Sequence, residues 1–258
     1  MYRFYVEKSE IQSGEVRLTG EDHNHIRNVL RMQPDQEITV CDGEGTDYLC
    51  RLKELDREQV TAELLSGKPS QTELPVQLVL YQGLPKKDKM ELIIQKAVEL
   101  GASRIVPVMT KRTVVRLEDE KKEARKRERW QSIARAAAMQ SMRGIIPQVS
   151  PVIPFSGALR EASGLGSAVI PYECARGIEE TRRFIAGLAE KRAGSVGIFI
   201  GPEGGFAPEE ITAAAAAGVC PITLGRRILR TETAGLAALS ILMLAFEEDG
   251  AEGEAAGN

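Results

Sequence analysis

The chain has 258 residues, of which 43% are hydrophobic and 28% charged, and its formal net charge is −3. Its four cysteines are too scattered for a Cys-x-x-Cys pair, and His23 and His25 have no third ligand nearby, which argues against a zinc site or a disulfide framework. The N-terminus lacks the apolar core of a signal peptide and the longest apolar run is too short to span a bilayer, so we expect a cytoplasmic protein without a membrane segment.

Short β-prone runs fill the first 70 residues. They are RFYV, EITVCD, DYLCRLKEL and QVTAELL, separated by turn signals such as CDGEGT and accompanied by one helical candidate, EDHNHIRNVLRM. This pattern predicts a first domain, residues 1–70, built as a small β-rich barrel with one inserted helix. The polar, proline-bounded segment SGKPSQTELP, residues 66–75, predicts a linker.

Alternating strands and helices are predicted over residues 75–247. The strand candidates are VQLVLYQGL, SRIVPVM, SAVIPYE, VGIFIG and PITLG, and the helix candidates are KMELIIQKAVEL, about 118–142, 179–190, a segment from Pro208 and a segment after Thr231. Continuous apolar strands alternating with helices indicate an α/β domain with a mostly parallel sheet covered on both faces. The acidic tail at 248–258 is predicted to be disordered.

A basic stretch lies in the middle of the chain. Residues 111–143 hold eleven Lys or Arg against five Asp or Glu, whereas residues 1–74 hold nine against fifteen. Composition leaves two interpretations open. The stretch either binds a polyanion or forms a solvated helix with ion pairs between neighbouring turns. The second interpretation is open because KKEARKRERW contains charges of both signs.

Three loops after predicted strands, PYECARG, GPEGGFAPEE and GRRILRTETA, are candidates for a ligand site, since ligands of open α/β sheets bind at the carboxyl ends of strands. The glycines of GPEGGF allow a ligand to approach the main chain and Glu203 offers a carboxylate. By itself, however, this motif favours a tight strand-to-helix turn. Phosphate-loop, dinucleotide-binding and nucleophile-elbow motifs are absent, which argues against an NTPase, an ordinary dehydrogenase and a Ser-His-Asp hydrolase.

The segment ILRTETA, residues 228–234, precedes a helix that is apolar nearly all round. Thr231 or Thr233 can cap that helix and Glu232 suits its positive end, so these residues have a local use. Arg230 has none, because a cation is unfavourable beside the positive end of a helix. Its position indicates an anionic or electron-rich partner, with a surface salt bridge as the alternative.

Several long motifs, in order, resemble one family. IGPEGGF, then LGRRILRTETA, then an apolar helix resemble the knotted SPOUT methyltransferases, in particular the bacterial ribosomal RNA small subunit methyltransferase E family, which makes 3-methyluridine in 16S rRNA. The resemblance extends over nearly the whole chain, through RFYV, HIRNVLRM, KMELIIQKAVELG, Lys111 to Thr113, RWQSIARAAAMQSMRGIIP and Tyr172–Glu173.

The resemblance implies a PUA-like RNA-binding β-barrel at 1–70, a SPOUT methyltransferase domain at 75–247 with a C-terminal trefoil knot, and a homodimer. It also implies that S-adenosylmethionine is the cofactor and binds in the knot. The cofactor-binding residues that it implies are Tyr172, Glu173, Ile200, Gly201, Pro202, Glu203, Gly204, Gly205, Leu224, Gly225, Arg226, Ile228, Leu229, Arg230 and Thr231.

Three positions depart from the family pattern. Arg226 stands where the family usually has Pro, Met139 where it has Glu, and Ala207 where it has Ser or Thr. Arg226 changes a residue of the cofactor loop and adds positive charge near the RNA, whereas Met139 leaves its position without a carboxylate.

The implied reaction is attack of uridine N3 on the methyl group of S-adenosylmethionine. N3 must lose a proton, so we expect Arg230 to stabilise the negative charge, with Glu203 or Glu232 as weaker candidates for the proton acceptor. The expected substrate is 16S rRNA within the 30S subunit, so the enzyme would act in ribosome biogenesis. The basic residues that align with the family's RNA-contacting positions are Arg3, His25, Arg27, Arg31, Lys111, Arg112 and Arg143.

Two alternative functions remain. A ribose 2′-O-methyltransferase of rRNA or tRNA is less favoured, because RTETAGLAAL stands where such enzymes have a run similar to S-L-N-V-S. A non-catalytic assembly factor that keeps the knot would bind RNA with little affinity for S-adenosylmethionine, and the intact glycine loop and Arg230 argue against it.

Overall fold

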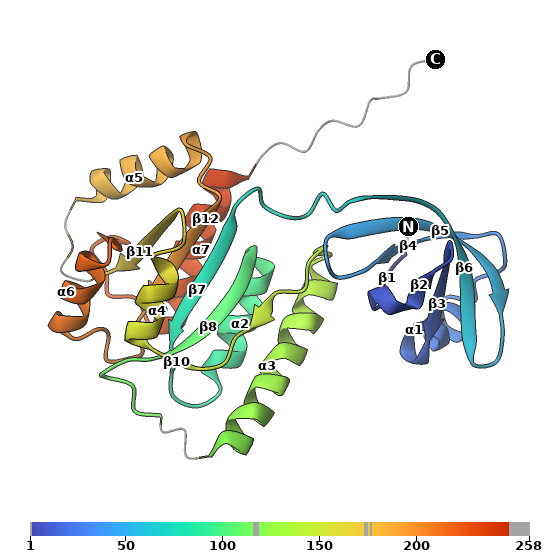
Figure 1. Cartoon of the computed structure of the whole chain (residues 1–258), viewed down its shortest axis with the longest axis horizontal. Coiled ribbons are helices and arrows are strands. Elements are labelled where there is room, and N and C mark those ends of the chain that lie inside the picture. The colour runs from blue at the N-terminus through green and yellow to red at the C-terminus, as the bar shows by residue number, and fades with distance from the viewer. Residues whose placement is uncertain (1, 116–118, 173–174, 176, 248–258) are drawn as a thin grey trace. The chain divides into compact units, whose positions relative to one another are not determined.

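The computed structural model describes residues 2–115, 119–172, 175 and 177–247, and the chain divides into two compact units (Figure 1). The first unit comprises Met1–Glu73 and Ala138–Ile146, and the second comprises Leu74–Ala137 and Pro147–Asn258. No helix of the described residues has the length and apolarity needed to cross a membrane.

The first unit is built on a six-stranded sheet in the order β1-β4-β5-β6-β3-β2. All neighbouring strands are antiparallel except β1 and β4. The strands are β1 (Arg3–Tyr5), β2 (Ile11–Gln12), β3 (Glu15–Thr19), β4 (Glu37–Cys41), β5 (Thr46–Leu55) and β6 (Gln59–Pro69), with η1 at Lys8–Glu10, α1 at Gly20–Asn24 and η2 at His25–Val29. Val16 and Leu18 of β3 are buried between exposed neighbours, as expected of a strand with one face on a core.

The segment after the long helix α3 (Glu120–Gln140) belongs to this first unit. Ile146 N donates to Gly43 O at 3.0 Å, Gly45 N donates to Gly144 O at 3.0 Å, and an isolated bridge pairs residues 44 and 145. The sequence placed the barrel within residues 1–70. The structure adds residues 138–146, since these supply backbone partners to the loop between β4 and β5.

The second unit contains a seven-stranded sheet in which every pair is parallel. Its order is β10-β8-β7-β12-β11-β13, and β9 pairs with β8. The strands are β7 (Gln77–Gly83), β8 (Ala102–Met109), β9 (Gln148–Val149), β10 (Ile153–Pro154), β11 (Ser167–Pro171), β12 (Ser195–Ile200) and β13 (Cys220–Ile222). The register pairs Ile200 at the end of β12 with Gln82 of β7, which brings the carboxyl ends of these strands together.

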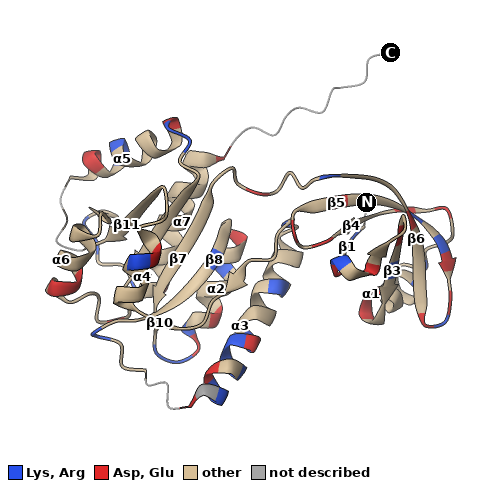
Figure 2. Cartoon of the chain, in the orientation of Figure 1, with Lys and Arg blue, Asp and Glu red and all other residues tan. Residues whose placement is uncertain are grey.

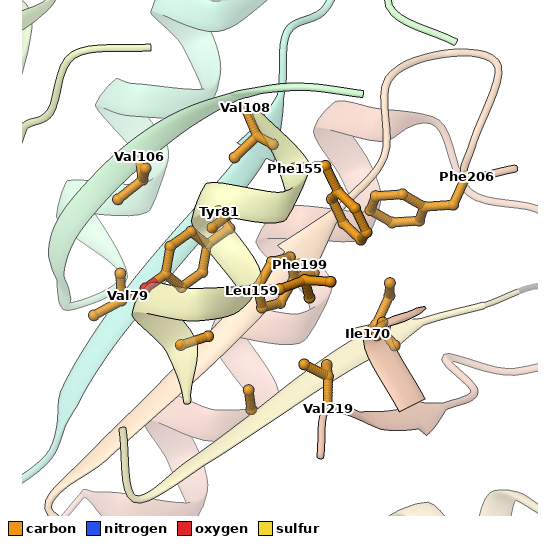
Figure 3. Close-up of a cluster of buried hydrophobic side chains, with 14 residues drawn as sticks. Val79, Tyr81, Val106, Val108, Phe155, Leu159, Ile170, Phe199, Phe206 and Val219 are labelled. Carbon is orange, nitrogen blue, oxygen red and sulfur yellow. The ribbon is translucent and has the colours of Figure 1, made fainter. Parts of the chain in front are cut away.

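Helices cover both faces of this sheet (Figure 1). They are α2 (Lys89–Glu99), α3, α4 (Phe155–Ala162), α5 (Ile178–Glu190), α6 (Pro208–Ala216) and α7 (Thr231–Phe246). On one face, α7 packs against α2, β7 and β12. On the other, α4 packs over Tyr81 and Phe199, whose rings stack at 4.5 Å, in the hydrophobic cluster of Figure 3. These apolar faces explain why the strands read as continuous hydrophobic runs.

Candidate active site

A pocket of about 520 Å³ lies where β11, β12 and β13 end and α7 begins. Its volume falls within the range of roughly 300–1,000 Å³ that is typical of small-molecule sites. Its lining comes from three loops and the starts of α2 and α7: Lys89, Pro171, Tyr172, Ile200, Gly201, Pro202, Glu203, Gly204, Gly205, Phe206, Thr223, Leu224, Gly225, Arg227, Ile228, Leu229, Arg230, Thr231 and Ala234. Such a position at the carboxyl ends of parallel strands is where open α/β sheets bind ligands.

The glycine loop, residues 201–205, is compact enough to require glycine. A Cβ atom on Gly201 would lie 3.0 Å from backbone atoms of Gly205, and one on Gly83 would lie 2.7 Å from the backbone nitrogen of Pro202. Phe206 anchors the end of the loop in the hydrophobic cluster beside α4 (Figure 3). The loop therefore presents main chain to the pocket.

A buried hydrogen-bond chain ties the glycine loop to the first turn of α7. The Gln82 side chain, fully buried at the end of β7, donates from Nε2 to Thr231 Oγ1 at 2.9 Å. The Thr231 hydroxyl in turn donates to Gly201 O at 2.6 Å. The prediction that Thr231 or Thr233 caps α7 was wrong, because the helix begins at Thr231, so that Arg230 is the N-cap residue and no side chain caps the helix.

An ion-pair cluster, Lys89, Glu203 and Glu232, stands at the pocket wall. Lys89 Nζ lies 3.2 Å from Glu203 Oε1 and 3.2 Å from Glu232 Oε2. Lys86 N also donates to both oxygens of Glu203, at 3.1 and 3.3 Å. Burial raises the pKa of Glu203, but these backbone donors and Lys89 outweigh it, so the net pKa lies below its ordinary value.

Arg230 lines the pocket from the N-cap position of α7, with an exposed side chain. Among the described residues, no carboxylate lies within ion-pair distance of its guanidinium, so the surface salt bridge considered from sequence is not formed there. A cation at the positive end of a helix without a counter-ion favours binding of an anion from outside the chain.

The structure brings together most of the predicted cofactor residues. Tyr172, Ile200 to Gly205, Leu224, Gly225 and Ile228 to Thr231 all line the pocket. The Arg226 side chain is not part of the lining, whereas that of its neighbour Arg227 is. Glu173 lies outside the described residues.

Sequence reasoning missed Lys89 and Gln82. Lys89 is the first residue of α2, so it is a cation at the positive end of a helix, which is the same signal that singled out Arg230. Gln82 carried no such signal, because an amide at the end of an apolar strand does not reveal its distant partner Thr231.

Ala207, which stands where the family usually has Ser or Thr, has no hydroxyl to cap α6, and Glu210 takes over part of this role. The Glu210 carboxylate accepts hydrogen bonds from Ala207 N and Lys111 N, both at 2.8 Å. The start of α6 thus keeps one half of a capping box although residue 207 has no hydroxyl. We expect little effect of this substitution on the glycine loop.

The seven predicted RNA-contacting residues divide by exposure. Arg3 and Arg143 are buried within the first unit: the side chain of Arg3 is 6% exposed and pairs with Asp47 at 2.7 Å, and that of Arg143 is 5% exposed and pairs with Glu73. Both guanidinium groups are thus engaged with carboxylates of the chain instead of being presented to a phosphate.

The other five of these residues are exposed. Arg27 donates to Asp56 O at 2.7 Å, and the ring of His25 contacts that of Phe4 edge to face. Lys111 pairs with Glu209, and Arg112 donates to Gly204 O at 2.7 Å, so Arg112 contacts the glycine loop.

In the part of the chain that the structure describes, no His, Cys, Asp or Glu cluster could hold a metal ion.

Comparison with known proteins gives consistent matches. A family model described as an RNA methyltransferase domain matches residues 72–243, and one described as an RNA methyltransferase PUA domain matches residues 18–65. "Ribosomal RNA small subunit methyltransferase E" of Bacillus subtilis (strain 168) is 37% identical over 246 residues, which cover 94% of this chain and 96% of that protein. The protein of the same name from Synechocystis is 33% identical over 93% of this chain and 76% of its own length.

Solved structures agree with these matches. The crystal structure of a ribosomal RNA small subunit methyltransferase E from Neisseria gonorrhoeae, bound to S-adenosyl methionine, superposes with a TM-score of 0.79 at 33% identity, over 95% of this chain and 98% of that one. A putative methyltransferase from Legionella pneumophila, in complex with the same cofactor, gives 0.77 at 32% identity, over 94% and 97%.

Proposed function

This chain belongs to the ribosomal RNA small subunit methyltransferase E family, and on that premise we propose that it uses S-adenosylmethionine to methylate N3 of a uridine in 16S rRNA, within the 30S subunit. The observation that carries the proposal is the pocket in which the glycine loop, the loop after β13 and Arg230 meet. A ribosomal substrate also supports a cytoplasmic location.

The pocket fits the cofactor in size and in the character of its walls. Its volume of about 520 Å³ suits a nucleoside-sized ligand, and Gly201, Gly204 and Gly205 of the glycine loop let a ligand approach the main chain. Gly225, with φ of +112°, gives the opposite loop a turn that other residues rarely adopt. We propose that Tyr172, the glycine loop and residues 224–231 hold the cofactor, without the side chain of Arg226.

The chemistry divides between cofactor and protein. S-adenosylmethionine supplies a methyl carbon bonded to a positively charged sulfur, which keeps the bonding electron pair when the methyl group leaves. The protein must favour the deprotonated form of uracil, because N3 is a poor nucleophile while it carries its proton. Arg230, which has no counter-ion in the described chain, is positioned to stabilise the resulting negative charge.

We propose that RNA is held by two basic surfaces, each within its own unit. The first comprises His25, Arg27 and Arg31. The second is α3, where Lys121 to Arg135 include seven Lys or Arg against two Glu. Figure 2 shows positions of both signs along this helix. Only Arg129 of these seven forms an ion pair with a described residue, so the solvated, pair-laced helix is the weaker interpretation. Lys121 and Lys122 also oppose the helix dipole, as expected if phosphate supplies the missing charge.

Replacing Lys121, Arg125 and Arg135 together by alanine should weaken RNA binding and reduce its salt dependence. Each lost phosphate contact lowers the slope of log K against log salt by about 0.7–0.9, so the slope should fall by roughly 2. Filter binding to a 16S rRNA fragment between 50 and 200 mM salt measures this. The matched control replaces Arg182, Arg183 and Lys191 of the α5 region and should leave the slope unchanged. Equal slopes in both triple variants would remove α3 from the RNA surface.

We further propose that the chain is a homodimer with a knotted C-terminal third, as the family resemblance implies. In support of the dimer, α7 exposes Leu244 at 74% and Ile241 at 42%, which is unusual for so apolar a helix. Leu244→Glu should therefore produce a monomer in light scattering, since burying a charge costs several kcal/mol. Val29→Glu, at an apolar position of the first unit that is 62% exposed, should leave the mass unchanged. A dimeric Leu244→Glu variant would contradict this interface.

The activity test is methyl transfer from labelled S-adenosylmethionine to 30S subunits that lack the modification, followed by nucleoside analysis of the 16S rRNA. A 3-methyluridine product would establish reaction and substrate class together. A 2′-O-methylated nucleoside would identify a ribose methyltransferase instead. RNA binding without cofactor affinity would identify a non-catalytic assembly factor.

A further inference from the structure

Lys89 connects three separate parts of the second unit. It begins α2, Glu203 belongs to the glycine loop, and Glu232 lies in the first turn of α7. One ammonium group contacts both carboxylates at 3.2 Å, and the side chains of Lys89, Glu203 and Glu232 are only 32%, 30% and 17% exposed. The two pocket walls that carry the glycine loop and Arg230 are therefore joined through a single cation.

The two carboxylates depend on Lys89 to different extents. Glu203 has other donors, because Lys86 N contacts both of its oxygens. The Oε2 atom of Glu232 is buried and accepts no hydrogen bond from any described group, so the Lys89 ammonium at 3.2 Å is its only compensation there. Removing the cation would leave a buried carboxylate oxygen beside a second carboxylate, an arrangement that strongly disfavours ionisation of both.

The charges in the cluster reinforce each other. Hydrogen bonding to Glu203 raises the pKa of Lys89, with a smaller contribution from Glu232, and the pKa of Glu203 is lowered. Lys89 and Glu203 are consequently held in their charged forms at neutral pH. The Glu203 carboxylate in this state is a weak base, and its lone pairs are directed at Lys89 and at the backbone of Lys86.

We propose that Lys89 is a positioning residue for methyl transfer, which fixes the glycine loop against the first turn of α7 and keeps Glu203 and Glu232 from accepting the N3 proton. The proton passes to water, and Arg230 stabilises the uracil anion that remains. The inference rests on the proposed function. The sequence left Glu203 and Glu232 as candidates for the proton acceptor. In this proposal both carboxylates instead hold the pocket walls together through Lys89. Among the residues that the structure describes, the other titratable groups in the pocket lining are Tyr172, Arg227 and Arg230.

The first test measures S-adenosylmethionine binding without RNA, by calorimetry between pH 6 and 8.5. Lys89→Met should weaken binding by about tenfold or more, the effect of losing one charged interaction. The loss should be greater at high pH than at low pH, because the Glu203 carboxylate is then charged without the ammonium that it contacts in the wild type. Lys89→Arg should stay within about threefold of the wild type, because charge and reach are kept. Lys87→Met removes an exposed lysine of the same connection and is the matched control.

The second test assigns the proton acceptor through single-turnover rates at saturating cofactor. Glu203→Gln and Glu232→Gln keep an oxygen for Lys89 and should each cost less than about tenfold, whereas loss of a general base costs about 10²–10⁴-fold. The wild-type rate should rise with pH from 6 to 8, as N3 releases its proton to water.

Three results would overturn the inference. They are Lys89→Met binding cofactor as Lys87→Met does, a loss above 10²-fold in either glutamine variant with normal cofactor binding, or a wild-type rate that is flat across this pH range. Absence of S-adenosylmethionine binding by the wild type is a separate result, since it would overturn the proposed function and the inference with it. Thermal melts of each variant show whether a loss reflects unfolding.

Discussion

Replacing Arg230 by alanine should lower the single-turnover methylation rate by about 10²–10³-fold, the cost typical of removing one group that stabilises charge in a transition state. The guanidinium lines the pocket and has no ion pair among the described residues, so its charge is available to the uracil anion. Affinity for S-adenosylmethionine should change by less than tenfold, because main-chain groups of the glycine loop remain. Rate and affinity are measured on the same preparation.

Two further variants sharpen the Arg230 experiment. Arg230→Lys keeps the charge but not the planar fork and should be intermediate in rate. Arg160→Ala removes an exposed arginine of α4, outside the pocket, and should behave as wild type. Normal turnover of Arg230→Ala would remove the assignment. A parallel loss of cofactor binding would show that Arg230 acts mainly by holding the cofactor and not by stabilising the uracil anion.

Arg143→Met should destabilise the first unit by about 3–5 kcal/mol, the effect of removing one partner of a buried ion pair. Arg143 is 4% exposed and pairs with Glu73, whose carboxylate also accepts from Gly144 N at 2.9 Å and Ile145 N at 3.1 Å. Without the guanidinium, the Glu73 carboxylate would lose its ion-pair partner in a mostly buried position. Urea unfolding followed by tyrosine fluorescence or circular dichroism measures the change in the free energy of unfolding.

A double variant separates charge from packing in this prediction. Arg143→Met with Glu73→Gln removes both charges and should recover a large part of the lost stability, because no unpaired carboxylate remains. Arg129→Met breaks the exposed pair with Glu91 and should cost less than about 1 kcal/mol. Equal stabilities of Arg143→Met and Arg129→Met would show that the buried ion pair contributes no more to the free energy of unfolding than the exposed one.

The local features of this protein follow from the sequence. The continuous apolar runs of β7 and β12 required cover on both faces, and the alternation in β3 required a single buried face. Arg230 stood out because its charge is wrong for a helix start, and glycine stood out in GPEGGF because close backbone approach excludes a Cβ atom. These inferences depend on chemistry within a few residues, which a single sequence contains.

Contacts between distant segments were decided by the tertiary structure alone. Lys89 meets Glu232, and Gln82 meets Thr231, only because α2, β7 and α7 pack together. Arg3 and Arg143 were expected at an RNA surface, yet they are buried in ion pairs, because the segment 138–146 returns to the first unit. The burial of a side chain and the identity of its partner depend on which distant segments pack together. The local periodicity of the sequence does not contain this information. The sequence by itself therefore determined the elements, the loops that line the pocket and the position of Arg230, whereas the tertiary structure decided which charges are paired and which remain available to a ligand.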